Sequence, residues 1–151
     1  MGTGSTAFAQ RFARFDLVDA SIVGRSFPPP APFEVTEAAL ADFAGSLGQS
    51  YDGGPAPLTF PIVPAFAAMM EFLAAEEIDL SRVVHGEQRF SYERPVVVGD
   101  LLSVTLTVAT LRQIGGNDIV GTTSAVTDAD GALVCTGTAT LVHRGVEEAE
   151  R

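Results

Sequence analysis

The side chains of this sequence that could move a proton are few and widely spaced. Asp52 lies in the turn-rich segment 48–57, and the two histidines are His85 and His143. A carboxylate beside an imidazole is a common acid–base pair, because one group transfers the proton while the other orients it. The segment around Asp52 contains no histidine, and its Tyr-Asp-Gly-Gly sequence is typical of a turn. We expect His85 and His143 to be ordinary strand histidines.

Glu71 is the other acidic side chain of interest, since it interrupts an apolar run. Its carboxyl either hydrogen-bonds to backbone at a seam between subunits, or acts as a general base with a pKa raised by burial. A third group of acids, Asp128-x-Asp130-Gly131, imitates part of a calcium loop, but Ala139 stands where that loop needs a bidentate glutamate. We therefore predict no metal site and no cofactor.

Composition excludes several functional classes. The chain has 151 residues and a formal net charge of −10, with nine arginines and no lysine. This acidic balance argues against nucleic acids and anionic membranes as partners, and the missing lysine excludes P-loop and Schiff-base chemistry. The single Cys135 excludes a disulfide within one chain. With no long apolar run and no secretion signal, we expect one cytoplasmic domain.

Two helices are expected in the first half of the chain. Thr36 fits an N-cap before a helix over 37–47, whose leucines, alanine and phenylalanine share one face. The segment 65–75 is apolar on nearly every side, and Pro64 suits its first turn. A surface helix would show a polar half, so something must enclose this one.

The second half of the chain predicts the enclosing sheet. Four long strands are expected at Val83–Tyr92, 102–109, 119–127 and 133–143. Short turns such as Asp128–Gly131 join the later strands, and connections this short make neighbouring strands antiparallel. The predicted fold class is α+β, with a curved antiparallel sheet wrapped around one buried central helix.

One segment resembles a known family. Residues 85–100, His-Gly-Glu-Gln-Arg-Phe-Ser-Tyr-Glu-Arg-Pro-Val-Val-Val-Gly-Asp, resemble the first outer strand of MaoC-like hydratases and dehydratases, which have the hotdog fold. The segments 56–60 and 138–144 are similar to the same group. The resemblance implies a single hotdog domain over 23–144, after an N-terminal arm at 1–22 and before an acidic tail at 145–151. It is closest to the non-catalytic subunit of the heterodimeric 3-hydroxyacyl-thioester dehydratase of the mycolic-acid type.

Active members carry Asp-x-Asn-x-x-His in the loop after the first helix, and this chain has only Asp52 there. The resemblance therefore implies no catalytic residue, with Asp52 and Glu71 kept as alternatives. In hotdog proteins the N-terminus of the buried helix polarises the thioester carbonyl, but Pro61 and Pro64 remove amide donors at that place. Expected substrate-binding residues, for which plain core packing is the alternative, are Leu58, Thr59, Phe60, Phe66, Met69, Met70 and Phe72.

The resemblance implies an acyl-chain-binding subunit that forms a heterodimer with a catalytic MaoC-like subunit. The pair would interconvert R-3-hydroxyacyl and trans-2-enoyl thioesters of CoA or acyl carrier protein. One alternative is a stand-alone homodimer that binds thioesters. Another is a thioesterase or dehydratase that uses Glu71, because Thr59-Phe60-Pro61, Pro64 and Glu71 faintly match the pattern of a second hotdog dehydratase group.

Overall fold

The computed structural model describes residues 17–145. Its elements, in chain order, are η1 (Ala20–Ile22), β1 (Ser26–Phe27), β2 (Phe33–Glu34), α2 (Glu37–Ser46), α3 (Ile62–Ala75), η2 (Leu80–Arg82), β3 (Val83–Tyr92), β4 (Leu101–Ile114), β5 (Asn117–Thr127) and β6 (Leu133–Arg144). Most of the predicted N-terminal arm, including a helical spacing of Phe8, Phe12 and Phe15, lies outside the described residues. So does most of the acidic tail.

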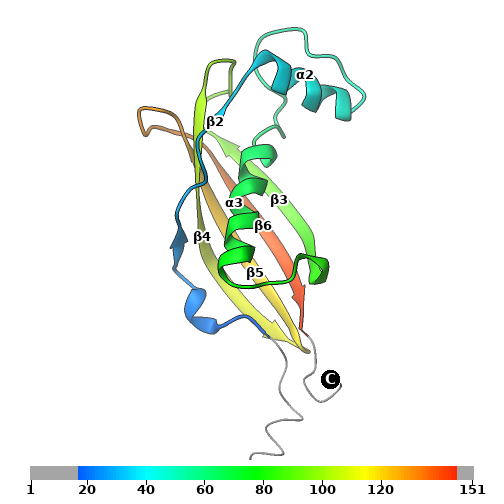
Figure 1. Cartoon of the computed structure of the whole chain (residues 1–151), viewed down its shortest axis with the longest axis vertical. Helices are drawn as coiled ribbons and strands as arrows, with labels where there is room; N and C mark the ends of the chain where they lie inside the picture. The colour runs from blue at the N-terminus through cyan, green and yellow to red at the C-terminus, as the bar shows by residue number, and fades with distance from the viewer. Residues whose placement is uncertain (1–16, 146–151) are drawn as a thin grey trace, which may run out of the picture.

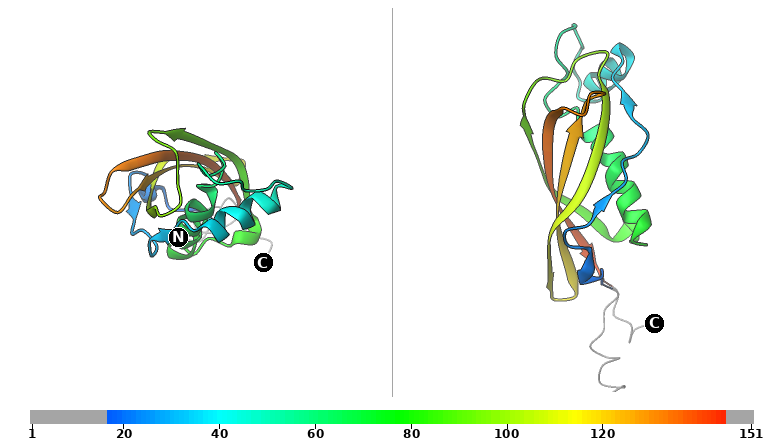
Figure 2. Two further views of the ribbon diagram at one scale, coloured as in Figure 1. Left: turned by 90° about the horizontal axis from the view of Figure 1, so that it is seen from above. Right: turned by 90° about the vertical axis from the view of Figure 1, so that its left-hand side faces the viewer.

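The strands form one antiparallel sheet in the order β1-β4-β5-β6-β3, and β2 pairs with β4 beside β1. The two long hairpins, β4–β5 and β5–β6, make the centre of the sheet. Figure 1 shows α3 lying along the sheet, with α2 beyond one end of it. The views in Figure 2 show the sheet curving around α3. The predicted hotdog fold is confirmed.

Burial alternates along the central strands, as the sequence pattern requires of a sheet with one covered face. The buried side chains of β4 are Leu102, Val104, Leu106 and Val108. They face α3, which contacts β4 and β1. Phe72 of α3 is fully buried and meets the ring of Phe27 edge-on, with centroids 4.9 Å apart. The core therefore lies between α3 and the concave face of the sheet.

Enclosure of α3 is incomplete within residues 17–145. Pro64, Ala65, Ala68, Met69, Phe72 and Leu73 are buried. The opposite side exposes Val63, Ala67 and Glu71, and Phe66 is 45% exposed. The sequence predicted a helix enclosed on all sides, whereas a single curved sheet covers only one side of it. The remaining apolar strip needs another surface if it is to leave water.

α2 begins where the sequence predicted. The Thr36 side chain accepts a hydrogen bond from the N–H of Ala39 at 3.0 Å. Phe43 then packs edge-on against Phe60, which lies just before α3, and Phe33 of β2 contacts the same ring. This aromatic cluster holds α2 and the entry to α3 together.

The chain before α2 contains a strand that the sequence analysis did not predict. β1 is two residues long, too short to show a period-two pattern, and it pairs Ser26 with Thr107 of β4. Upstream, the N–H of Val18 donates to Asp118, a residue of β5 that is fully buried. Residues 17–27 are thus attached to the sheet by long-range pairing.

In residues 17–145 no helix is both long and apolar enough for a membrane span.

Candidate functional site

A largely apolar pocket opens between α2, the start of α3 and β3. Its volume is about 560 Å³, within the range of small-molecule sites. The residues that line it are Phe43, Leu47, Thr59, Ile62, His85, Gly86, Glu87, Gln88 and Phe90. Most of its wall is hydrocarbon or aromatic, with a few polar groups on the β3 side. Such a lining suits an apolar chain that carries a polar group at one point.

The backbone amides at the start of α3 are already engaged. The N–H of Phe60 donates to Pro57, that of Ile62 to Thr59, and that of Val63 to Phe60. Pro61 and Pro64 have no N–H to offer. Residues 60–64 therefore present no free amide donor for an oxyanion, in line with the proline argument from sequence.

Tyr92 positions the segment that leads into α3. Its hydroxyl donates to the carbonyl of Leu58 at 2.6 Å. Burial, with a smaller contribution from Cys135, raises the pKa of Tyr92 to about 12, so the hydroxyl keeps its proton at neutral pH. Burial also raises the pKa of Cys135 to about 11, which keeps it a thiol and not a nucleophilic thiolate.

The pocket lining holds one imidazole, His85, and one carboxylate, Glu87, but each contacts a different partner, since Glu87 pairs with the guanidinium of Arg89. Asp52 and Glu71 are both exposed, and neither is among the residues that line it. His85 does line the pocket, where its Nε2 lies 3.0 Å from the Oε1 of Gln88, an amide and not an acid. His143 is buried elsewhere in the sheet, 2.8 Å from Asp118.

The expected substrate-binding residues fall into three environments. Thr59 lines the pocket. Phe60, Met69 and Phe72 belong to the buried core, and Met70 packs against it. Leu58 is 72% exposed and Phe66 lies on the open side of α3, so a wall containing them requires surface beyond that of residues 17–145. Whether these side chains form an acyl channel stays a prediction.

Several pocket residues were not singled out from the sequence. Phe43, Leu47 and Ile62 were assigned to helix packing or passed over, and Gln88 and Phe90 entered only as part of the family motif. For Gln88 and Phe90, the sequence signal that could have found them is the glycine inside the β3 pattern. Gly86 marks a bulge that changes which side chains of β3 face inward.

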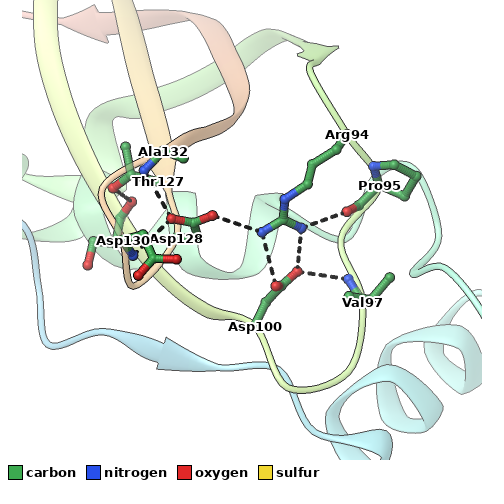
Figure 3. Close-up of polar contacts among 9 residues, drawn as sticks. Arg94, Pro95, Val97, Asp100, Thr127, Asp128, Asp130 and Ala132 are labelled. Carbon is green, nitrogen blue, oxygen red and sulfur yellow. Dashed lines mark hydrogen bonds and ion pairs between the residues drawn. The ribbon is translucent and has the colours of Figure 1, made fainter.

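The Arg-Pro-x-x-x-Gly-Asp part of the motif serves to hold a loop. Arg94 makes two hydrogen bonds to Asp100, at 2.9 and 3.1 Å, and a third to Asp128 at 3.3 Å (Figure 3). Asp100 also accepts from the N–H of Val97. This cluster joins the 93–100 loop to the β5–β6 turn, and the same loop accepts the N–H of Ala56 through Val96. It therefore fixes the loop against the segment that enters α3.

Both carboxylates of this cluster have lowered pKa values. Burial alone would raise the pKa of Asp100, but hydrogen bonds from Arg94 and Val97 outweigh it and lower the pKa. The N–H of Ala132 is the main cause that lowers the pKa of Asp128, with a further contribution from Arg94. The folded state thus holds fewer protons here than the unfolded chain.

We expect this cluster to make the fold sensitive to acid. The stability that it contributes is complete above the ordinary aspartate pKa of about 4 and is lost as the pH falls through the lowered folded-state values. Arg94→Gln should flatten that loss, which urea titrations at a series of pH values would measure. The exposed Arg112 is the control, since Arg112→Gln should leave the pH profile unchanged. Equal profiles for wild type and Arg94→Gln would contradict the assignment.

The family model described as "FAS1-like, dehydratase domain region" matches residues 33–137, from β2 to within β6. The chain belongs to this family. A UPF0336 protein of Streptomyces coelicolor is 40% identical to this chain, with 87% of this chain and 99% of that protein covered. A UPF0336 protein of Clavibacter michiganensis is also 40% identical, with coverage of 85% and 97%.

Solved structures support the same grouping. One chain of the HadBC (3R-hydroxyacyl-ACP dehydratase) complex of Mycobacterium tuberculosis is 28% identical, with a TM-score of 0.70 over 80% of this chain and 96% of that chain. A MaoC-like dehydratase is 25% identical, with a TM-score of 0.69 over 82% of this chain and 42% of that chain. The resemblance to MaoC-like dehydratases that the sequence indicated is confirmed.

Proposed function

We propose that this FAS1-like dehydratase domain is the acyl-chain-binding, non-catalytic subunit of an R-3-hydroxyacyl-thioester dehydratase. Its active partner would be a MaoC-like subunit that supplies the Asp/His pair. The single observation that carries the proposal is the apolar pocket of about 560 Å³, in which the only imidazole is partnered by an amide and the only carboxylate, Glu87, is paired with Arg89, while Asp52 and Glu71 lie outside it. The pocket can accommodate an acyl chain, but its imidazole and its carboxylate each contact another side chain.

Two surfaces beside the pocket support association with a second hotdog subunit. Within residues 17–145, β3 ends the sheet, with β6 on one side, and its Val84 is 64% exposed. Such an edge offers backbone donors and acceptors to a strand of another chain. The open strip of α3, with Val63 and Phe66, adds apolar surface nearby. The complex named HadBC among the similar structures gives a precedent for two different subunits.

The test compares activity with and without a partner. We expect the purified chain to hydrate neither crotonyl-CoA nor longer enoyl-CoA substrates by itself. Co-expression with a MaoC-like subunit that carries Asp-x-Asn-x-x-His should give a heterodimer with turnover, and Asp52→Asn or Glu71→Gln in this chain should leave that turnover within about twofold, because both side chains lie outside the pocket.

Three results would contradict the proposal. The first is turnover by the chain alone that Asp52→Asn, Glu71→Gln or His85→Ala abolishes. The second is release of free thiol from acyl-CoA in a manner that depends on Glu71, which would indicate a thioesterase. The third is a homodimer in size-exclusion chromatography that associates with no MaoC-like subunit.

A further inference from the structure

A β-bulge determines which side chains of β3 reach the pocket. The pairing of β3 with β6 runs from His85 opposite Leu141 to Glu87 opposite Thr140, so Gly86 is the extra residue. In a regular strand, residues 85 and 88 would point to opposite faces of the sheet. The extra residue shifts the phase by one, which places His85 and Gln88 on the same face. The contact between the side chains of His85 and Gln88 agrees with this geometry.

Gly137 of β6 provides the space for this arrangement. It lies opposite Phe90 in the register. A Cβ at position 137 would stand 3.2 Å from the amide nitrogen of Gln88 and 3.2 Å from the ring of Phe90. A side chain at residue 137 would therefore force these two side chains to shift, and the glycine leaves room for both.

The amide of Gln88 sets the protonation pattern of the imidazole. Its NH₂ group donates to the carbonyl of Arg89 at 3.3 Å, which turns Oε1 toward His85. An amide oxygen only accepts, so Nε2 of His85 carries the hydrogen. In the neutral ring the other nitrogen, Nδ1, is then an acceptor without a proton.

We infer that His85 is a specificity residue of the pocket, whose Nδ1 accepts a hydrogen bond from a hydroxyl group on the bound acyl chain, with Gln88 as its positioning residue. The inference rests on the proposed function. The rest of the wall, with Phe43, Leu47, Ile62 and Phe90, contacts the hydrocarbon part of the chain. A ring nitrogen that only accepts distinguishes a hydroxyl, which can donate, from a ketone, which cannot.

The experiment measures binding of three CoA thioesters of equal length by calorimetry: decanoyl, 3-hydroxydecanoyl and 3-oxodecanoyl. It uses the full chain in the assembly that the co-expression experiment yields, with the histidine of the partner's Asp-x-Asn-x-x-His motif replaced by alanine so that the hydroxylated thioester is not dehydrated during the measurement. One neutral hydrogen bond is expected to favour the hydroxylated chain over the saturated one about fivefold, with no gain for the 3-oxo chain. His85→Ala should reduce the ratio of hydroxylated to saturated affinity to about 1.

A charge change at the positioning residue gives a readout that a structural role would not move. In Gln88→Glu, a carboxylate faces the ring and favours the doubly protonated imidazolium, so Nδ1 becomes a donor. The 3-oxo chain should then gain affinity relative to the saturated chain. Ser91→Ala is the matched control, because Ser91 is exposed on the opposite face of β3. All three affinities should be unchanged in that variant.

The possible failures are distinguishable. If the wild type binds all three thioesters equally, or if the preference for the hydroxyl survives His85→Ala, this inference is overturned while the acyl-binding function stands. If no thioester binds, the proposed function is overturned and this inference with it.

Discussion

Asp118→Ala is expected to lower the free energy of unfolding by about 3–5 kcal/mol, because it removes a buried carboxylate on which three hydrogen-bond donors converge. The carboxylate of Asp118 is fully buried and accepts from three donors. These are the N–H of Val18 at 2.9 Å, the side-chain amide of Gln113 at 2.8 Å and Nδ1 of His143 at 2.8 Å. Without the carboxylate, these donors lose their partner in a place shielded from water. Urea denaturation followed by circular dichroism would measure the loss.

The matched control for this change is Asp130→Ala. Asp130 is exposed in the β5–β6 turn, so its removal should change stability by less than about 0.5 kcal/mol. Hydrogen exchange at the amide of Val18 adds a local readout, since its protection should disappear in Asp118→Ala and persist in Asp130→Ala. Equal stability of the two variants would mean that the buried pair does not hold residues 17–19 to the sheet.

Phe72→Ala is expected to cost about 3–5 kcal/mol of stability, as large-to-small changes at fully buried phenylalanines do. The ring of Phe72 has no exposed surface and packs edge-on against Phe27, so truncation leaves a cavity between α3 and β1. Thermal or urea unfolding of the chain without a partner would measure the effect. Because Ile62 begins the same helix and Thr59 lies just before it, a loosened α3 should also weaken acyl binding.

Phe66→Ala is a control with the same chemistry in the same helix. Phe66 is 45% exposed in the isolated chain, so its loss should cost less than about 1 kcal/mol of stability there. The same variant should weaken association with a second subunit, if the open strip of α3 is covered in the complex. Equal destabilisation by both variants would contradict the assignment of inner and outer faces to α3.

The elements of the fold that could be predicted from the sequence are those that depend on neighbouring residues. Period-two alternation at Leu102, Val104, Leu106 and Val108 and the turn at Asp128–Gly131 predict strands and hairpins, because side-chain alternation and turn geometry depend on neighbouring residues. The apolar segment 65–75 likewise predicts a covered helix. β1 escaped prediction because two residues carry no period, and its pairing partner lies about eighty positions away.

The candidate site was predictable only in part. The missing histidine beside Asp52 is visible in the sequence, and so is the family motif at residues 85–100. His85 was interpreted as an ordinary strand histidine, because a strict alternation cannot show which face a residue takes after a bulge. The bulge at Gly86 depends on how β3 pairs with β6, some fifty residues later.

The amino-acid sequence alone thus specified the types of the elements, the hairpins and the covered helix. It also showed that the loop around Asp52 contains no acid–base pair. The pocket arises only in the folded chain. Its walls come from α2, the start of α3 and β3, and long-range packing brings these elements together. The contact of His85 with Gln88 and the open side of α3 have the same origin. Both arise from the way a single curved sheet covers a helix, which no local pattern specifies.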